Sequence, residues 1–97
     1  MAGKNQVGHE TLTVSTTSLP FAARPATTRR AFIYVGSQPV RWRGDGTDPT
    51  ATVGVFVAAG DYIDWTDIDR PDFLARVEFI RDTTAVADAT LAIAYFD

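Results

Sequence analysis

The chain of 97 residues contains 45% hydrophobic and 22% charged residues, which fits one small globular domain and leaves no room for a second. It has no cysteine and one histidine, His9, so disulfides, thiolate metal sites, cysteine nucleophiles and multi-histidine metal sites are excluded, and histidine-based triads are disfavoured. The net charge of −3 argues against an electrostatic grip on nucleic acid or on an anionic membrane. The composition as a whole argues against an enzyme.

The N-terminal segment is polar, shows no periodicity and ends in Gly8, so we expect residues 1–8 to form a flexible arm. Residues 9–97 would form the single folded domain. The N-terminal segment lacks the apolar stretch of a signal peptide, and no apolar run approaches the roughly 18–20 residues that span a bilayer. We therefore expect neither a signal peptide nor a transmembrane segment.

Short runs of alternating or β-branched residues, separated by turn residues, predict strands along most of the domain. In the first strand Leu12 and Val14 would face inwards, and in the last strand Leu91, Ile93 and Tyr95 would do so. The predicted strands, in chain order, span residues 11–16, 31–35, 40–43, 53–58, 62–65, 73–81 and 89–96.

Three of the middle strands carry more specific expectations. The run at 31–35 is apolar throughout, so we expect it to be buried on both sides. The next strand alternates, which places Val40 and Trp42 on one face and both of its arginines on the other. In the strand at 53–58 three valines would share a face, and Gly54 would mark a place where a neighbouring backbone or large side chain packs closely.

The last strand but one is ambiguous. Helical spacing would bring Phe73, Val77 and Ile80 to one face, and a proline two residues before the segment suits a helix start. Alternation instead gives one wholly apolar face, with Arg76 and Glu78 on the other. Because that separation of apolar from charged residues is complete, we favour a strand.

About seven short strands, with turn signals every roughly 8–12 residues, predict an all-β domain. Its architecture would be a single antiparallel β-sandwich with jelly-roll or immunoglobulin-like Greek-key connections. A domain of this size buries only about 60–65% of its unfolded surface, so its aromatic residues must supply much of the core. Association into oligomers is a common remedy for such a small core.

Aspartates gather between residues 61 and 72 and could suggest a calcium loop. An EF-hand loop needs oxygen ligands at fixed offsets, a central glycine and a closing glutamate, and this run has neither glycine nor glutamate. A solvated acidic loop that includes Asp67 and Asp69 fits the pattern better. A paired-carboxylate hydrolase has less support, because a small sandwich offers little cleft. We expect no catalytic residue, no metal site and no cofactor.

Arginine supplies nearly all of the positive charge, and five arginines fall between residues 24 and 43. Trp42 lies between two of them, as in stacking platforms for single-stranded nucleic acid, but on a strand it would face away from both. Arginine is preferred at protein interfaces, where it pairs with carboxylates, so we expect this basic group to meet an acidic surface such as the aspartate loop of another copy. The predicted interface residues are Lys4, Arg29, Arg30, Arg41, Arg43, Asp45, Asp48, Asp67 and Asp69.

The tripeptide Arg43-Gly44-Asp45 is known from cell-adhesion ligands. Glycine and aspartate are also the residues that a tight turn requires, because glycine accepts a positive φ and aspartate caps its own turn. We favour the turn over the adhesion motif.

The stretch from Val40 to Gly54 is an arginine-bearing strand, a turn of sequence DGTDPT and a strand containing glycine. It resembles a recurrent block in small virion proteins of tailed bacteriophages. Gly60-Asp61, Phe79-Ile80-Arg81 and a closing apolar strand that ends near Tyr95 fit the same pattern, so the resemblance covers roughly residues 30–97. It implies a compact β-sandwich that serves as a capsid cement or decoration protein, or as an accessory part of the neck, tail or fibre.

The resemblance and the residues together predict a non-enzymatic structural protein of the virion, assembled in the host cytoplasm. We expect a capsid cement protein that binds the finished shell in many copies through the N-terminal arm and the segment 41–50. Its partners would be the major capsid protein or other virion proteins and further copies of itself, with no nucleic acid and no membrane. The alternatives are a neck, tail or fibre protein and a carbohydrate-binding module that uses Trp42, Trp65 or Tyr62 as a stacking platform.

Overall fold

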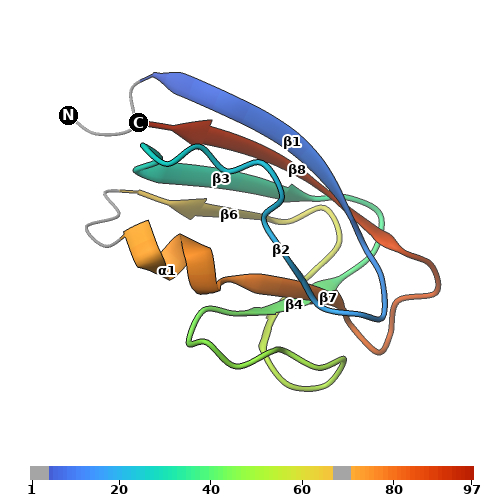
Figure 1. Cartoon of the computed structure of the whole chain (residues 1–97). Coiled ribbons are helices and arrows are strands. Elements are labelled where there is room, and N and C mark those ends of the chain that lie inside the picture. Colours follow the sequence, from blue (N-terminus) through green and yellow to red (C-terminus); the bar gives the residue numbers. More distant parts are fainter. Residues whose placement is uncertain (1–4, 67–70) are drawn as a thin grey trace.

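The computed structural model describes residues 5–66 and 71–97 and, at residues 71 and 72, the backbone alone. Within these residues the chain forms eight strands and one short helix (Figure 1). In chain order they are β1 (Gln6–Val14), β2 (Leu19–Pro20), β3 (Arg30–Val35), β4 (Val40–Arg43), β5 (Val55–Val57), β6 (Tyr62–Trp65), α1 (Pro71–Arg76), β7 (Glu78–Arg81) and β8 (Ala89–Phe96).

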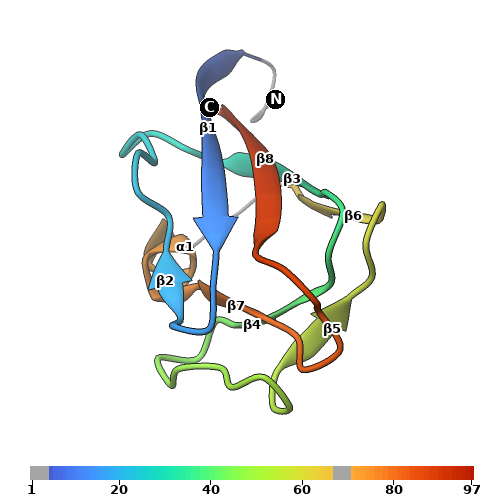
Figure 2. The same cartoon turned by 90° about the vertical axis from the view of Figure 1, so that its right-hand side faces the viewer.

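The strands form two antiparallel sheets that face each other. One sheet has the order β1-β8-β3-β6 and the other has the order β2-β7-β4-β5. The pairings are nested, because β1 pairs with β8, β2 with β7, β3 with β6 and β4 with β5 (Figures 1 and 2). Nested pairing of eight strands in two sheets is the topology of a jelly roll. The predicted all-β antiparallel sandwich is confirmed, and its connections are those of the jelly roll.

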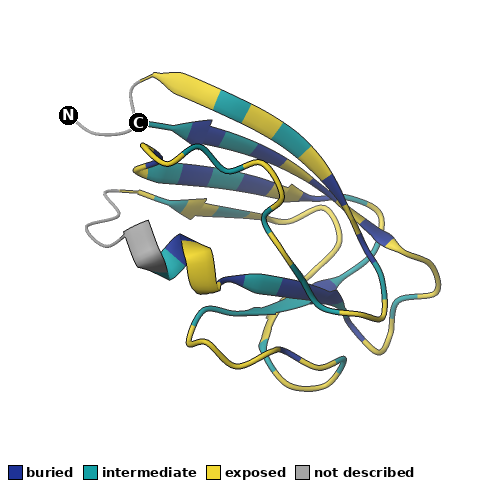
Figure 3. Cartoon of the chain, in the orientation of Figure 1, coloured by how far each residue is buried: buried dark blue, intermediate teal, exposed yellow. Residues whose placement is uncertain are grey.

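The core lies between the two sheets and is built from alternate residues of the strands (Figure 3). Leu12 and Val14 of β1 are buried as predicted, and so are Leu91, Ile93 and Tyr95 of β8. These faces could be predicted because each of the two strands has one buried face and one more exposed face. Successive side chains of a strand point to opposite faces, so the buried residues recur at every second position of the sequence.

β3 is buried on one side only, so the prediction that residues 31–35 are buried on both sides is wrong. Ala31, Ile33 and Val35 face the core and are fully buried. Phe32 is half-buried and Tyr34 is 46% exposed on the outer face of the sheet. The one helix among the described residues lies on the other side of this sheet and leaves that outer face uncovered (Figure 1).

β5 is shorter than the predicted strand at 53–58. Of the three valines that are predicted to share a face, Val57 is buried, whereas Val53 and Val55 are 50% and 52% exposed. Val53 exchanges backbone hydrogen bonds with Thr50, at 2.9 and 3.2 Å, and this tight turn prevents it from joining the strand. β5 is also an edge strand of its sheet, so β4 is the only strand beside it to shield its residues from solvent.

The segment predicted as a strand over residues 73–81 forms α1 and then β7, so the prediction is wrong for its first half. α1 begins at Pro71, whose missing N–H costs nothing in the first turn of a helix, and ends at Arg76. The spacing of buried residues changes from that of a helix to that of a strand within a few residues. For this reason neither a uniform helix nor a uniform strand accounts for all of the buried side chains. Those side chains are Leu74, Val77, Phe79 and Ile80.

The boundary predicted for the N-terminal arm is wrong at its inner end. β1 begins at Gln6, which pairs with Phe96, and Gly8 pairs with Tyr95 after an irregularity at Val7. The first and last described residues meet here, since the Asp97 N–H donates to the carbonyl oxygen of Asn5 at 3.0 Å. Local sequence patterns contain little sign of this pairing, because its partner groups come from β8, which is distant in the sequence. Of the predicted arm, residues 1–4 lie outside the described residues.

A partly buried hydrogen-bonded group ties β1 to the connection between β2 and β3. The Glu10 carboxylate accepts hydrogen bonds from the Tyr95 hydroxyl and from the backbone N–H groups of Ala22 and Ala23, the latter two at 3.2 and 3.0 Å. Burial raises the pKa of the Tyr95 phenol above its usual value, and the bond to Glu10 raises it further, so the phenol stays a donor.

Replacing Glu10 with alanine is expected to lower the free energy of unfolding by about 1–3 kcal/mol, because three donors lose their acceptor at once. Thr11→Ala, on the exposed face of the same strand, should change it by less than about 0.5 kcal/mol. Urea unfolding of both variants measures the difference. Equal effects would show that the carboxylate does not hold this connection.

Candidate functional site

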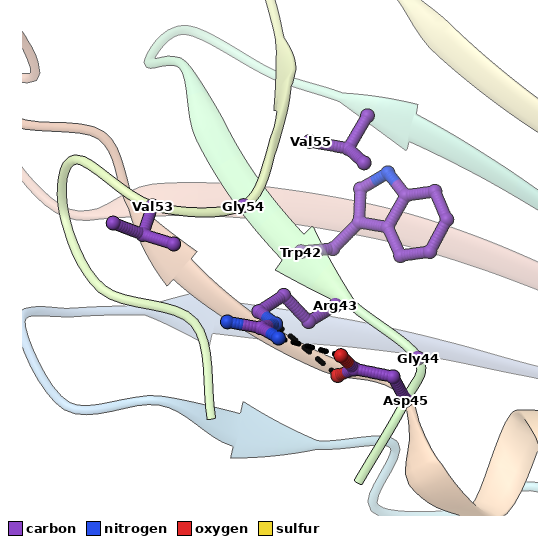
Figure 4. A pocket seen from close by; sticks show the side chains of 7 residues that line it. All are labelled: Trp42, Arg43, Gly44, Asp45, Val53, Gly54 and Val55. Carbon is purple, nitrogen blue, oxygen red and sulfur yellow. Dashed lines mark hydrogen bonds and ion pairs between the residues drawn. The ribbon is translucent and has the colours of Figure 1, made fainter. Parts of the chain in front are cut away.

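The described surface has a hollow where the turn after β4 runs beside the segment that leads into β5. It is an open pocket of about 410 Å³ (Figure 4). All of its lining lies within or next to the Val40–Gly54 block that carries the phage resemblance. The lining residues are Trp42, Arg43, Gly44, Asp45, Val53, Gly54 and Val55.

Trp42 forms the inner wall of this pocket. Its ring packs edge to face against Trp65 and Phe73, with ring centres 4.9 and 6.3 Å apart, and these two rings contact each other in the same way. Its N–H makes no hydrogen bond within the described residues, and none of their buried side-chain nitrogens or oxygens lacks a partner, so this N–H is open to solvent. Val55, which lies opposite Trp42 in the ladder, is half exposed beside it. The wall is therefore apolar with one free donor.

The charged side of the pocket is a closed ion pair. Arg43 donates from Nε and Nη2 to the two carboxylate oxygens of Asp45, at 3.1 and 2.5 Å. Asp45 also accepts from the Thr47 backbone N–H at 3.2 Å. The bonds from Arg43 and then from Thr47 lower the pKa of Asp45 to about 2. Arg43 and Asp45 bind each other across the turn, which agrees with a turn at this tripeptide and leaves neither group extended as an adhesion motif would need.

The pocket floor depends on a glycine. Gly54 has φ +140°, a backbone conformation that side-chain-bearing residues rarely adopt, and a Cβ there would lie 3.0 Å from the Trp42 carbonyl oxygen. The predicted close approach of a neighbouring backbone at Gly54 is confirmed. The Gly54 carbonyl accepts from Arg41 Nη1 at 2.9 Å, so the same residue fixes the loop to β4.

Arg41 is the centre of a second ionic group, on the outer face of the sheet β2-β7-β4-β5. Its Nε donates to Asp82 at 2.6 Å, and its guanidinium lies 5.5 Å from the centre of the Phe56 ring. Asp82 also accepts from the backbone N–H and the hydroxyl of Thr84, at 2.9 and 2.6 Å. Arg41 thus fastens the β7–β8 connection to the pocket loop.

The predicted interface residues are not brought together on one face. Arg30 pairs with Asp64 through two hydrogen bonds of 3.0 and 2.9 Å on the opposite sheet from Arg41, and Arg43 pairs with Asp45. Arg29 and Asp48 are exposed. Lys4, Asp67 and Asp69 lie outside the described residues. The pattern of the sequence could not show this, because Arg30 and Arg41 pair with carboxylates that only the fold brings near.

The other notable surface is the outer face of the sheet β1-β8-β3-β6, which the sequence interpretation missed. It carries Phe32, Tyr34 and Tyr62, of which the two tyrosines are 46% and 59% exposed. Phe32 and Tyr34 alternate with the buried residues of β3, so the period of a one-sided strand is present in the sequence, but the aromatic character of the outer residues hides it.

Among the described residues no group of three metal-ligating side chains lies close enough to hold an ion. No described helix has the length and apolar character needed to cross a membrane. Comparisons with protein-family models, with curated proteins and with solved structures returned no match. The functional interpretation therefore depends on the chain's own surfaces.

Proposed function

We propose that this chain is a structural protein of a tailed-bacteriophage virion, a capsid decoration protein that binds the assembled shell through the surface around Trp42. The single observation that carries the proposal is that the phage-like block from Val40 to Gly54 builds the wall, the turn and the floor of the open pocket beside Trp42. Jelly rolls also recur in viral capsid domains, which supports the proposal by analogy of fold.

The pocket loop is held in one shape by its own hydrogen bonds. Asp45 caps the turn at Thr47, and the Thr50 hydroxyl accepts from the Val53 N–H at 3.0 Å. The Ala51 carbonyl accepts from Thr83 at 3.0 Å, which anchors the loop to the β7–β8 connection. A surface that is ordered before binding loses little conformational entropy when it binds, so a modest contact area can hold a partner.

The chemistry of the pocket suits a protein partner. Half-exposed Val53 and Val55 beside the Trp42 ring would bury apolar area, and the free indole N–H would donate a hydrogen bond to one carbonyl or hydroxyl oxygen. The Arg43–Asp45 pair borders the pocket with charges that cancel. An apolar centre with a polar rim is the usual anatomy of a protein interface. Many copies that each engage two capsid subunits would stabilise the shell by avidity.

The test uses particles from the phage that encodes the chain and the purified protein. Quantitative mass spectrometry should find the protein in many copies per purified particle, and the protein should bind shells that lack it. Absence from particles would overturn the proposal. A few copies per particle would instead assign the protein to the neck, tail or fibre.

Val55→Asp should weaken shell binding by about tenfold or more, because a carboxylate would have to lose its water beside Trp42. Ala26→Asp adds the same charge on the exposed connection before β3 and should bind as the wild type does. A sedimentation assay of shells mixed with each variant measures both. Undiminished binding by Val55→Asp would show that the pocket is not the contact.

A further inference from the structure

We propose that two copies of this chain associate through the outer face of the sheet β1-β8-β3-β6, about a twofold axis that lies in the interface. This surface belongs to the other sheet from the pocket loop, so the inference goes beyond the proposed shell-binding function and does not depend on it (Figure 2).

The strand registers divide this face into two halves. Opposite one another across the four strands lie Thr11 of β1, Ala92 of β8, Tyr34 of β3 and Tyr62 of β6. The adjacent row on the same face, two residues along each strand, contains His9 of β1, Ala94 of β8, Phe32 of β3 and Asp64 of β6. In these two rows the β3–β6 half therefore carries the aromatic side chains of Phe32, Tyr34 and Tyr62, whereas the β1–β8 half carries the small side chains of Thr11, Ala92 and Ala94, with His9 on the edge strand as its one larger side chain. We call Phe32, Tyr34 and Tyr62 the ridge of this face. The trough beside it is formed by Thr11, Ala92 and Ala94.

Two aromatic rings of the ridge pack against each other. The rings of Phe32 and Tyr62 come from neighbouring strands and stack with an interplanar angle of 24° and ring centres 5.3 Å apart. Phe32 and Tyr62 lie diagonally in the β3–β6 ladder, and their stacked rings give this half of the face its bulk. A sugar ring stacks on a flat aromatic face, and here the stack covers one face of each ring, so this geometry favours insertion into a groove over a carbohydrate platform.

A ridge and a trough on one face are complementary to a second copy of that face. Rotation by 180° about an axis that runs parallel to the strands, between β8 and β3, places each ridge over the partner's trough. A twofold interface requires this self-complementarity, and closed twofold dimers are the commonest oligomers. A ridge at the centre of the face would have met another ridge instead. The asymmetry of the face therefore points to a second copy as the occupant.

The charges on the face permit close approach of two copies. Its arginine and aspartate, Arg30 and Asp64, form a bidentate pair, and the Arg30 guanidinium lies 5.0 Å from the centre of the Phe96 ring. Apart from the two tyrosines, the remaining ionisable group in the two central rows is His9. Two chains of net charge −3 would therefore meet at a face whose strong charges are already neutralised.

The size of the face predicts a weak dimer. Four strands about 4.8 Å apart and about six residues long give a patch of about 20 by 20 Å. Two such patches cover about 800 Å² when taken as flat, and the relief of the side chains brings the buried area towards about 1,000 Å², the lower limit for a specific interface, so we expect a dissociation constant on the order of 10–100 μM.

Sedimentation velocity of the purified full chain, from about 5 to about 500 μM, tests the inference. The wild type should shift from monomer to dimer over this range. Tyr62→Arg removes part of the ridge and adds a charge, and Thr11→Trp fills the trough without touching the ridge, so both variants should remain monomeric at the highest concentration. Val86→Arg carries the same new charge on an 85% exposed side chain in the β7–β8 connection and should dimerise as the wild type does.

Circular dichroism must show that each variant is folded as the wild type is. A wild type that stays monomeric throughout would overturn the inference, and so would a dimer that survives both Tyr62→Arg and Thr11→Trp. A dimer that is lost with Tyr62→Arg but kept with Thr11→Trp would contradict the ridge-in-trough packing. A monomer whose tyrosine fluorescence changes on addition of oligosaccharides would assign the face to carbohydrate. None of these results bears on shell binding, which is measured with separate variants.

Discussion

Replacing Asp82 with alanine is expected to lower the free energy of unfolding by about 3 kcal/mol. The carboxylate is 3% exposed and accepts hydrogen bonds from Arg41 and twice from Thr84. Its removal leaves a partly buried guanidinium without its carboxylate and releases the β7–β8 connection. Asp88→Ala is the matched control, because Asp88 pairs with Arg81 at 2.9 Å but is half exposed, and its loss should cost less than about 1 kcal/mol.

The Asp82 contribution should also depend on pH. Bonds from the Thr84 hydroxyl and backbone, and then from Arg41, lower the pKa of Asp82 from 3.8 to about 2. A carboxyl group whose pKa is depressed in the folded state stabilises that state above its unfolded pKa, and this contribution disappears as the pH falls through the folded pKa. The wild type should therefore lose stability between about pH 4 and pH 2, and Asp82→Asn should lose less. Urea unfolding at pH 7, 4, 3 and 2 measures this, and parallel profiles for the two proteins would contradict it.

Replacing Gly54 with alanine is expected to cost about 3 kcal/mol, whereas Gly46→Ala should cost about 1 kcal/mol. Both glycines have positive φ, at +140° and +87°, so both substitutions strain the backbone. They differ in space, because a Cβ at Gly54 would press on the Trp42 carbonyl oxygen at 3.0 Å and one at Gly46 would meet nothing within 4 Å. Comparison of the two variants therefore separates the free-energy cost of the positive-φ conformation from the cost of the steric clash at Gly54.

Thermal and urea unfolding of both glycine variants give the comparison. The Gly54 variant should also bind shells more weakly, because the pocket floor and the carbonyl that Arg41 holds would shift together. Equal destabilisation by the two substitutions would show that Gly54 is required for its φ alone and not for the close approach to β4.

The sequence determined which residues face the core in β1 and β8, where large apolar residues alternate with polar or small ones. Leu12 and Val14 in β1, and Leu91 and Ile93 in β8, follow the local alternation, and that alternation needs no knowledge of the partner strand. It also determined the Gly54 constraint, because an isolated glycine within a strand pattern indicates close backbone packing. These features are local, so a single pass along the chain could find them.

Only the tertiary structure decided the strand pairing, the ionic partners and the exposed faces. The nested pairing brings Asp82 to Arg41 from 41 residues away and Asp64 to Arg30 from 34 residues away, so the arginines that look like one basic group serve two different sheets. Phe32 and Tyr34 look like core residues because they are aromatic, yet their exposure depends on whether another layer covers the sheet. Such properties depend on contacts between distant segments, and local patterns of residues do not encode them.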